Sequence, residues 1–327
     1  MRVAVVDIGT NSTRLLIADV DRETGALEQL VRESRVTRLG EGVDTSGALG
    51  DAAIERVLAT LADYREQIDA HDCEANLAVL TSAVRDASNG REFADRVRDE
   101  FGLDARVLRG EEEAQLTFLG AMSGRPARSA REQERGDGGR RGDGDGDGEA
   151  TVVIDVGGGS TEFIVGVGTR AGFDVSLQAG VVRMSERHIQ SDPPDPSELQ
   201  QLSADVHETF LDGLPYDERD SVTRGIAVAG TATSAAAIDQ ELDPYDPQRV
   251  DGYELTLGTV EMLLARLADM DEARRRQVVG LHPDRAPTIV AGMIVLGEAM
   301  RAFELEQVEV SEHDILHGGA LRLAGVG

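Results

Sequence analysis

The chain has 327 residues, with 61 acidic residues against 33 basic ones and a formal net charge of -28. This excess of negative charge argues against a general binder of nucleic acid or of acidic membranes, because such a protein needs a basic face. The 40% hydrophobic content excludes a wholly disordered chain, and the single cysteine excludes an internal disulfide framework and a multi-cysteine zinc site.

The first predicted element is a β-hairpin that returns later in the chain. Residues 3–20 read VAVVDIGTNSTRLLIADV, and residues 151–168 read TVVIDVGGGSTEFIVGVG. In each copy an apolar strand ends in Asp, a turn of the form D-x-G-x-x-S-T follows, and a second apolar strand begins. The repeat predicts two halves of similar build, in keeping with a length of about two domains at roughly 100–200 residues each.

Strands and helices alternate through the rest of the first half. The pattern predicts strands at 26–38, 75–80 and 105–108, and helices from 51, at 91–101 and at 111–122. Such alternation is typical of an α/β fold with a partly parallel sheet. We therefore predict a first domain over residues 1–123.

A polar segment separates the two halves. Residues 124–150 contain almost no apolar residue and many Gly, Arg and Asp, which predicts a disordered acidic, glycine-rich insertion. Its DGDGDG stretch at 143–148 is compatible with a calcium loop. That pattern needs Glu six positions after its glycine, and the position is occupied by Ile154, so a solvated linker is the better interpretation.

The second half, residues 151–327, is predicted to be a second α/β domain. Asp195 as N-cap and Pro196 at the first helical position start a helix through residue 210. A strand at 225–229 runs into a glycine-rich turn at 230–234. Further helices are predicted at 259–269, 272–279 and 287–302, followed by a strand at 308–310 and a helical turn at 318–324.

The two hairpin turns have the composition of a phosphate site. Glycine lets the backbone approach a ligand closely, its N–H groups form an anion nest, and Ser and Thr hydroxyls add donors. A single copy is often only a turn, whereas two copies in register favour phosphate binding. The predicted binding residues are Gly9, Thr10, Asn11, Ser12, Gly157, Gly158, Gly159, Ser160 and Thr161. The carboxylates Asp7 and Asp155 are oxygen ligands that suit Mg²⁺.

This double pattern resembles the actin-like ATPase superfamily, in which two hairpins clasp phosphates across an interdomain cleft. The motifs DIGTNSTRLLI, RLGEG (38–42), TSAVRDASN (81–89), RGEEEAQLTFLGA (109–121) and DVGGGSTEF follow in order. Together they resemble the exopolyphosphatase/guanosine pentaphosphate phosphatase (Ppx/GppA) family in its short, two-domain form. The resemblance implies an α/β fold of two actin-like (ribonuclease H-like) domains with a cleft between them.

The resemblance also implies a catalytic glutamate. The family's base directly precedes the Ala of its EEA motif, which is Glu113 here, with Glu112 as a distant second. A carboxylate base contributes about 10²–10⁴-fold to such a hydrolysis. The alternative is that Glu111, Glu112 and Glu113 simply favour the helix dipole in a first turn, which explains acids there as a class.

Further site residues follow from the same motifs. Arg85 falls at the family's phosphate-binding arginine, where a guanidinium fork suits phosphate oxygens, and Arg38 is a weaker candidate for the same cleft. Glu162 resembles the second acidic metal ligand beside Asp155, although strand alternation would also allow it to point into solvent. One departure is His317, which stands where many members have arginine.

The leading expectation is an exopolyphosphatase that hydrolyses the terminal phosphoanhydride of inorganic polyphosphate to orthophosphate, with Mg²⁺ or Mn²⁺ as cofactor. Guanosine pentaphosphate, cleaved at its 5′-phosphate end, is the alternative substrate. Two alternatives of other classes are an ATP-dependent sugar kinase and a non-catalytic polyphosphate sensor. The resemblance allows a homodimer, and we expect neither a nucleic-acid nor a membrane partner.

The charge is interpreted as habitat. Every basic residue is an arginine, and an acidic, lysine-free chain is typical of a salt-accumulating halophile. At 1 M salt, charge is screened within about 3 Å, so a polyanionic substrate needs only a local lining of arginine. The strand that begins at once, the single Cys73 and the lack of an apolar run of roughly 18–20 residues predict a cytoplasmic protein without a signal peptide.

Overall fold

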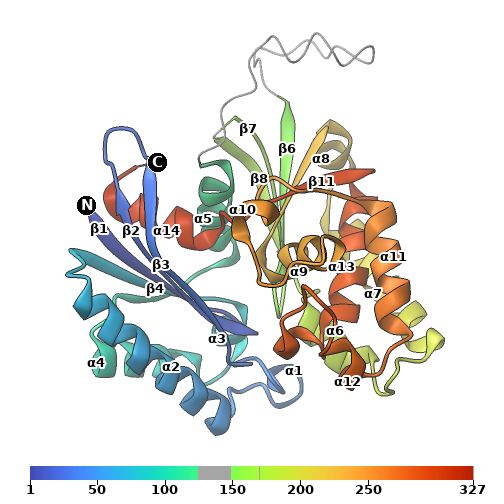
Figure 1. The fold of residues 1–327 in the computed structure, drawn as a ribbon, viewed down its shortest axis with the longest axis horizontal. Coiled ribbons are helices and arrows are strands. Elements are labelled where there is room, and N and C mark those ends of the chain that lie inside the picture. Colours follow the sequence, from blue (N-terminus) through green and yellow to red (C-terminus); the bar gives the residue numbers. More distant parts are fainter. Residues whose placement is uncertain (124–148, 169, 327) are drawn as a thin grey trace.

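The computed structural model describes residues 1–123, 149–168 and 170–326, which form two β-sheets flanked by helices (Figure 1). Residues 124–148 of the predicted insertion over 124–150, with its DGDGDG stretch, lie outside the described residues, and the first strand after it already begins at Ala150. The two sheets with their helices confirm the predicted α/β class. No helix in the described part of the chain is long and apolar enough to cross a membrane.

The two sheets share one topology. The first is five-stranded, in the order β3-β2-β1-β4-β5, and the second is six-stranded, in the order β10-β11-β9-β6-β7-β8. The first-sheet strands are β1 (Arg2–Ile8), β2 (Ser12–Val20), β3 (Leu27–Val36), β4 (Ala75–Leu80) and β5 (Ala105–Val107). The second-sheet strands are β6 (Ala150–Val156), β7 (Thr161–Val167), β8 (Arg170–Leu177), β9 (Arg224–Val228), β10 (Glu254–Thr256) and β11 (Gln307–Val310). Read from β8, the second sheet repeats the strand order of the first: β8-β7-β6-β9-β11 corresponds to β3-β2-β1-β4-β5, and β10 is an additional edge strand.

The two hairpins repeat each other in register as well as in sequence. β1 pairs antiparallel with β2 so that Asp7 lies opposite Arg14, and β6 pairs with β7 so that Asp155 lies opposite Glu162. Both turns close with the same backbone hydrogen bond, from Gly9 N to Ser12 O and from Gly157 N to Ser160 O, each 3.0 Å. The internal repeat read from the sequence is therefore a repeat of structure.

Helices cover the sheets in the order expected, with local differences. The helices are α1 (Val43–Ser46), α2 (Asp51–Ala70), α3 (Ser82–Asp86), α4 (Gly90–Phe101), α5 (Gly110–Met122), α6 (Val181–His188), α7 (Pro196–Gly213), α8 (Tyr216–Ser221), α9 (Ala229–Asp239), α10 (Pro247–Val250), α11 (Leu257–Ala268), α12 (Glu272–Arg275), α13 (Ile289–Ala302) and α14 (Ile315–Ala324). The glycine-rich segment 230–234 belongs to the first turns of α9 instead of forming a separate turn. The predicted helix at 272–279 is only the four-residue α12.

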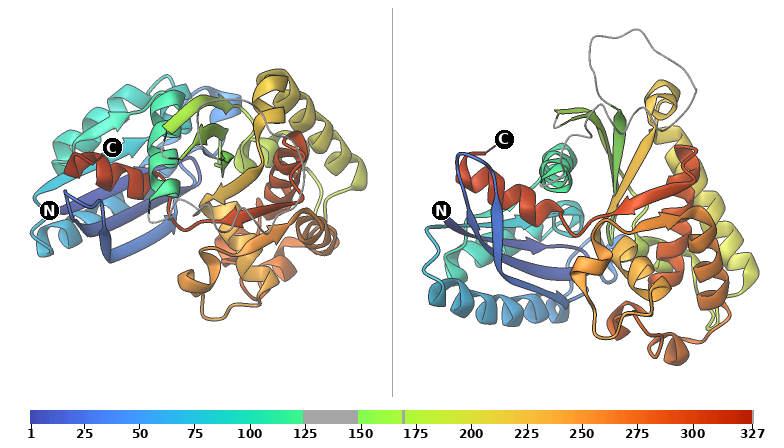
Figure 2. Two further views of the ribbon diagram at one scale, coloured as in Figure 1. Left: turned by 90° about the horizontal axis from the view of Figure 1, so that it is seen from above. Right: turned by 45° about the horizontal axis from the view of Figure 1, so that its top comes forward.

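The last helix packs on the first sheet, whereas chain order assigned residues 151–327 to the second domain. Leu316 and Leu321 of α14 form a buried cluster with Val3, Val5 and Leu16 of β1 and β2, and Figure 2 shows α14 beside these strands. The physical reason is that both apolar faces of the first sheet must be buried by helices. The helices α2 and α4 bury one face of the first sheet, and the apolar residues of the other face need a partner.

Helix α5 lies between the two halves. Its Ala114 and Phe118 pack into a buried cluster with Val153 and Ile164 of the second sheet, and α5 also packs along α14. The helix that carries the predicted catalytic glutamate is therefore held from both sides, which fixes where its first turn points.

Candidate functional site

The cleft between the two sheets is lined by residues from both hairpin turns. Its empty space is about 820 Å³. Among the residues predicted from sequence, those that line it are Asp7, Gly9, Thr10, Asn11, Ser12, Glu113, Asp155, Gly157, Gly158, Ser160 and Glu162. The fold therefore brings together side chains that are up to 155 positions apart in the chain, as 162 minus 7.

The two turns touch each other across the cleft. A Cβ atom added at Gly158 would lie 2.8 Å from Thr10 Cβ and 3.0 Å from Asn11 N. One added at Gly159 would lie 2.6 Å from Ser82 Oγ, and Ser82 in turn shares a 2.8 Å hydrogen bond with Thr10. Only a residue without a side chain fits such a close approach.

The second turn directs its N–H groups away from its own domain. The carbonyls of Gly157, Gly158 and Gly159 accept hydrogen bonds from Val181, Val182 and Gly180 at the start of α6, at 2.9, 2.8 and 3.2 Å. In a trans peptide the following N–H points opposite to the C=O. The N–H groups of residues 158–160 therefore face away from α6, as an anion nest requires.

Gly158→Val is expected to raise the KM for a phosphate-chain substrate by at least about tenfold, because the new side chain would push the two turns apart and misplace the bound phosphates. Steady-state kinetics would measure it. The control is Gly172→Ala on β8, where an added Cβ meets one backbone oxygen at an ordinary 3.6 Å. An unchanged KM for Gly158→Val would contradict the close approach of the turns.

Glu113 is the one acid of its triplet that points into the cleft. Its carboxylate accepts a 2.9 Å hydrogen bond from Arg85 Nη1, and the same nitrogen donates to the Leu108 carbonyl at 3.1 Å. Burial, followed by the charge of Glu162, raises the pKa of Glu113 well above its usual range, while Arg85 opposes the rise. A raised pKa suits a proton acceptor that works near neutral pH.

The other two acids of the triplet have different positions. Glu112 caps its own helix, because its side chain accepts a 3.0 Å hydrogen bond from Arg109 N in a capping box. Glu111 is exposed to solvent. The helix-end explanation that the sequence left open thus applies to Glu112, and Glu113 remains the candidate base.

The acidic residues of the second hairpin are buried beside Glu113. Glu162 accepts hydrogen bonds from Ser160 and Ser176 at 2.6 and 2.7 Å, so it does not point into solvent. Burial and the neighbouring charge of Glu162 raise the pKa of Asp155 to about 8. Carboxylates crowded in this way favour a cation between them.

Arg14 is a cleft residue that sequence reasoning missed. It donates to Asp7 Oδ2 from Nε and Nη2, at 2.8 and 2.6 Å, and it pairs through Nη1 with Asp314. Burial alone would lower the pKa of Arg14, but the carboxylates of Asp314, Asp7 and Asp155 outweigh burial and raise it. The signal was in the repeat, since Arg14 occupies the position that Glu162 has in the second hairpin.

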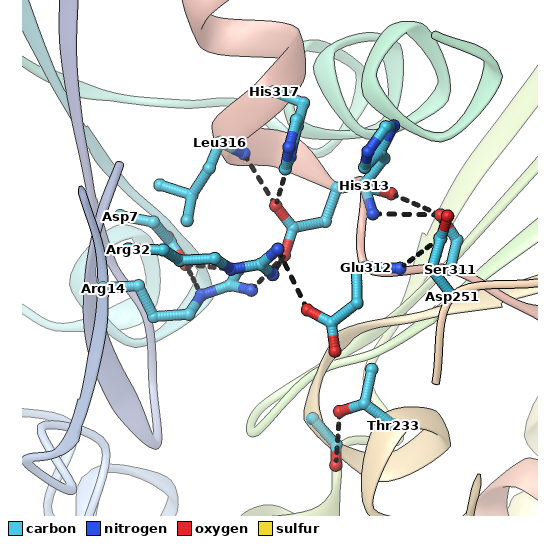
Figure 3. A network of polar contacts seen from close by, with 12 residues as sticks. Asp7, Arg14, Arg32, Thr233, Asp251, Ser311, Glu312, His313, Leu316 and His317 are labelled. Atoms are coloured by element: carbon cyan, nitrogen blue, oxygen red, sulfur yellow. Dashed lines mark hydrogen bonds and ion pairs between the residues drawn. The ribbon is translucent and has the colours of Figure 1, made fainter. Parts of the chain in front are cut away.

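The segment that carries Asp314 connects the second sheet to α14. Figure 3 shows Arg14 and Arg32 of the first sheet beside Glu312 of this segment, with Arg32 Nη1 2.9 Å from Glu312 Oε2. His317 is buried and lies 3.9 Å from Asp314 Oδ1. Burial lowers the pKa of His317, and the expectation that many members have arginine at this position stays a prediction.

Arg285 is a second missed residue. It lines the cleft, is half-buried, and donates to the Gly230 carbonyl at 2.5 Å and to the Ser234 hydroxyl at 2.7 Å. Burial lowers the pKa of its guanidinium. The PDR segment that contains it carries no glycine or repeat pattern, so only the tertiary structure reveals it.

Some predicted residues lie outside the cleft wall. Arg38 donates to the Asp284 carbonyl at 3.3 Å on the exposed side, and Thr161 donates to the Ala179 carbonyl at 2.7 Å. Gly159 does not line the cleft but packs against Ser82 of the first half. Arg85 does not line it either, and its contact with the site is its hydrogen bond to Glu113. Arg38 and Thr161 therefore belong to the frame of the site, and direct phosphate contact by them stays a prediction.

The donor set fits a hard cation that is completed by substrate. Asp7 keeps Oδ1 buried without a hydrogen-bond partner in the structure, while Oδ2 is occupied by Arg14. Within the described residues, no group of three or more His, Cys, Asp or Glu side chains is arranged to hold a metal ion. Mg²⁺ usually takes one or two carboxylates plus waters and phosphate oxygens, so this sparse oxygen set suits Mg²⁺ better than a metal that needs a full protein cage.

A wider cavity opens beyond the cleft. It has about 1660 Å³ of empty space and shares Arg14, Ala229, Gly230 and Arg285 with the cleft wall. Its remaining lining mixes polar groups with apolar and aromatic side chains, among them Tyr245 and Leu281. The part of a substrate that lies behind its terminal phosphates has room there.

Known proteins match the whole chain. A family model described as the Ppx/GppA phosphatase family matches residues 16–132 and 145–324. Exopolyphosphatase 2 of Mycobacterium tuberculosis is 35% identical over 335 residues, which cover 99% of this chain and 99% of that protein. The crystal structure of the Aquifex aeolicus member of the Ppx/GppA family is 29% identical and covers 99% of this chain and 97% of that one, with a TM-score of 0.77. An exopolyphosphatase from Cytophaga hutchinsonii is 26% identical, covers 100% and 99%, and has a TM-score of 0.82.

Proposed function

The chain belongs to the Ppx/GppA phosphatase family of hydrolases, and on that premise we propose that it is an exopolyphosphatase, which releases orthophosphate from the end of inorganic polyphosphate. The observation that carries the proposal is Glu113. Its carboxylate is buried, held by Arg85, and faces the cleft where the two glycine-rich turns meet.

The chemistry follows from these positions. The N–H groups and hydroxyls of the two turns hold the terminal phosphates, and Arg85 and Arg285 add positive charge near them. Glu113 accepts a proton from a water molecule as its oxygen attacks the terminal phosphorus. The bond between that phosphorus and the bridging oxygen breaks, and the shortened chain leaves with the electron pair.

A divalent cation fits this scheme as a cofactor. One or two of the carboxylates of Asp7, Asp155 and Glu162 would hold Mg²⁺ or Mn²⁺, and water and phosphate oxygens would supply the other ligands. When bound, the cation supplies neutralisation of phosphate charge. Ser160 and Ser176 already donate hydrogen bonds to Oε1 of Glu162, which limits the oxygen lone pairs that Glu162 has for a cation.

The pH dependence follows from the raised pKa of Glu113. A base works only when it is deprotonated, so kcat/KM should rise with pH through that pKa. Arg85 holds the pKa down, so Arg85→Met should move the acidic limb of the profile to higher pH and also lower the plateau. A pH–rate profile of both forms would show this. A limb that stays in place, or that moves to lower pH, would contradict the pairing of Arg85 with Glu113.

The direct test is phosphate release. The full chain is incubated at high salt with polyphosphate and Mg²⁺, and orthophosphate is measured against samples without metal and without protein. Release of orthophosphate one unit at a time from the chain end supports the proposal. Phosphate transfer from ATP to a sugar with polyphosphate left intact would favour the kinase alternative, and tight binding of polyphosphate without release would favour the sensor.

Guanosine pentaphosphate remains the second candidate, and the wider cavity favours it. The cavity has apolar side chains such as Tyr245 and Leu281, and its four arginines are matched by four acids. Such a neutral, partly apolar wall suits a nucleoside behind a phosphate chain better than a bare polyanion. The arginines are Arg14, Arg32, Arg276 and Arg285, and the acids are Glu33, Asp243, Glu312 and Asp314. Both substrates end in the same phosphoanhydride. Parallel measurement of kcat/KM for the two substrates decides between them. The cytoplasmic location and the homodimer stay predictions.

A further inference from the structure

A second set of contacts between the two halves lies behind the phosphate site, on α6. The guanidinium of Arg183 makes three polar contacts there. Its Nε donates to the carbonyl of Gly159 at 2.8 Å, Nη2 donates to Asp86 at 3.0 Å, and Nη1 pairs with Asp44. Gly159 belongs to the second turn, whereas Asp44 and Asp86 belong to α1 and α3 of the first half.

We propose that Arg183 is a positioning residue for phosphate-chain hydrolysis, because it fixes the second glycine-rich turn to the first half of the molecule. The inference rests on the proposed function. Arg183 does not line the cleft and touches no residue that would bind the reacting phosphate with its side chain. Its effect on the reaction would pass through Gly159 and Asp86.

The geometry explains why an arginine is needed. The side chain of Arg183 is 13% exposed and meets one carbonyl and two carboxylates on different elements. The guanidinium spreads its N–H groups over three nitrogens in one plane, so it reaches acceptors on three separate elements, whereas the three N–H groups of a lysine share a single nitrogen.

The same side chain is connected to the catalytic groups on the first half. Asp86 directly follows Arg85 on α3, and their side chains approach to 3.9 Å between Arg85 Nε and Asp86 Oδ1. Arg85 in turn holds Glu113. Arg183 therefore contacts two parts of the site. It binds the carbonyl of Gly159 in the second turn, and it binds Asp86, the neighbour of the arginine that holds Glu113.

Neighbouring contacts provide a matched control. Arg187, one turn further along α6, also pairs with Asp44, at 3.3 Å, but its other partner is Asp205 of the second half. It reaches neither Gly159 nor Asp86 in these contacts. Loss of Arg187 removes a charge from the same helix and an ion pair between the same two halves, without releasing the phosphate-binding turn.

The experiment compares Arg183→Gln, Arg183→Lys and Arg187→Gln for kcat and KM on polyphosphate, together with their melting temperatures. Calorimetric titration with inorganic tripolyphosphate, in a Glu113→Gln background, measures binding apart from turnover. We expect Arg183→Gln to lower kcat/KM by about 10- to 100-fold and to weaken tripolyphosphate binding. Arg183→Lys should recover only part of the loss, and Arg187→Gln should change kcat/KM less than about twofold.

A double-mutant comparison identifies the route. If Arg183 acts partly through Asp86, then Arg183→Gln combined with Asp86→Asn should cost less than the product of the two separate losses. Independent losses would overturn the Asp86 route. Unchanged kcat/KM and tripolyphosphate binding in Arg183→Gln, with an active wild type, would overturn the inference, as would full recovery by lysine.

Failure of the proposed function has a different signature, since the wild type would then release no phosphate from polyphosphate at all. Should Arg183→Gln not fold, Asp86→Asn alone makes the test at a site whose side chain is 31% exposed. It is expected to lower kcat/KM with little change in melting temperature, and an unchanged kcat/KM would count against the inference.

Discussion

Replacing Glu113 with Gln is expected to lower kcat for phosphate release by about 10²- to 10⁴-fold, the contribution of a positioned proton acceptor. The amide keeps the size and the hydrogen-bonding oxygen of the side chain, so the contact with Arg85 can persist, but it cannot accept the proton of the attacking water. The turns and arginines that bind the phosphates are untouched. Tripolyphosphate should therefore still bind, which calorimetry would measure beside a phosphate-release assay.

Glu111→Gln is the matched control for this variant. It makes the same chemical change two residues earlier on the same helix, at an exposed position outside the cleft. We expect its kcat to stay within about twofold of wild type. If Glu113→Gln keeps most of its kcat, or if both variants lose activity alike, Glu113 is not the base.

Replacing Arg14 with Met is expected to lower the free energy of unfolding by about 3–5 kcal/mol, because it leaves buried carboxylates without their cation. Arg14 is 15% exposed and is shared by Asp7 and Asp314, whose side chains are 5% and 2% exposed. Methionine fills much of the same volume as arginine, so the lower free energy of unfolding would come from the lost charge more than from lost packing. Urea denaturation at constant salt would measure it.

The control is Arg2→Gln on the same sheet. Arg2 pairs with Asp19 at 2.8 Å, but both side chains are more than a third exposed, and such surface pairs are worth about 0–1 kcal/mol. A similar loss in the two variants would contradict the special burial of Arg14.

The effect of Arg14→Met should also depend on pH. Burial alone would raise the pKa of Asp314, but Arg14 and its other partners hold that pKa below its usual range. The stabilisation from Asp314 is therefore present above the pKa of an unfolded Asp, near 3.9, and is lost as the pH falls. The stability difference between Arg14→Met and wild type should shrink on acidification, because protonated carboxylates no longer need the guanidinium.

The family and the fold class were predictable from the chain because their signals are local. Asp-Gly turns between apolar strands, and the order of the motifs, can be read residue by residue, and the family match and the two sheets confirm them. The repeat predicted two halves of similar build, and the resemblance to the actin-like superfamily implied that the two turns would line one cleft, where the structure places them. The roles assigned to individual site residues stay predictions until the variants are measured.

Within one triplet, sequence could not choose on physical grounds. Glu111, Glu112 and Glu113 are the same residue type in one helical turn, and each favours the helix dipole equally. Successive residues of a helix point in directions about 100° apart. Which of the three glutamates faces the cleft therefore depends on how α5 is rotated once it packs between the second sheet and α14. Only then does Glu113 become buried beside Arg85, while Glu112 folds back onto Arg109.

The sequence by itself determined the two phosphate hairpins, the acids that end their first strands and the family to which the chain belongs, because backbone turns and strand ends are specified by neighbouring residues. Only the tertiary structure decided that Arg14 and Arg285 line the cleft, that Arg183 contacts the second glycine-rich turn, and that the last helix returns to the first sheet. Asp7 lies only seven positions from Arg14, but the other partners of these three arginines lie 24 to 300 positions away, as with Gly159 for Arg183 and Asp314 for Arg14. Such pairings depend on where folded elements meet, which no local pattern specifies.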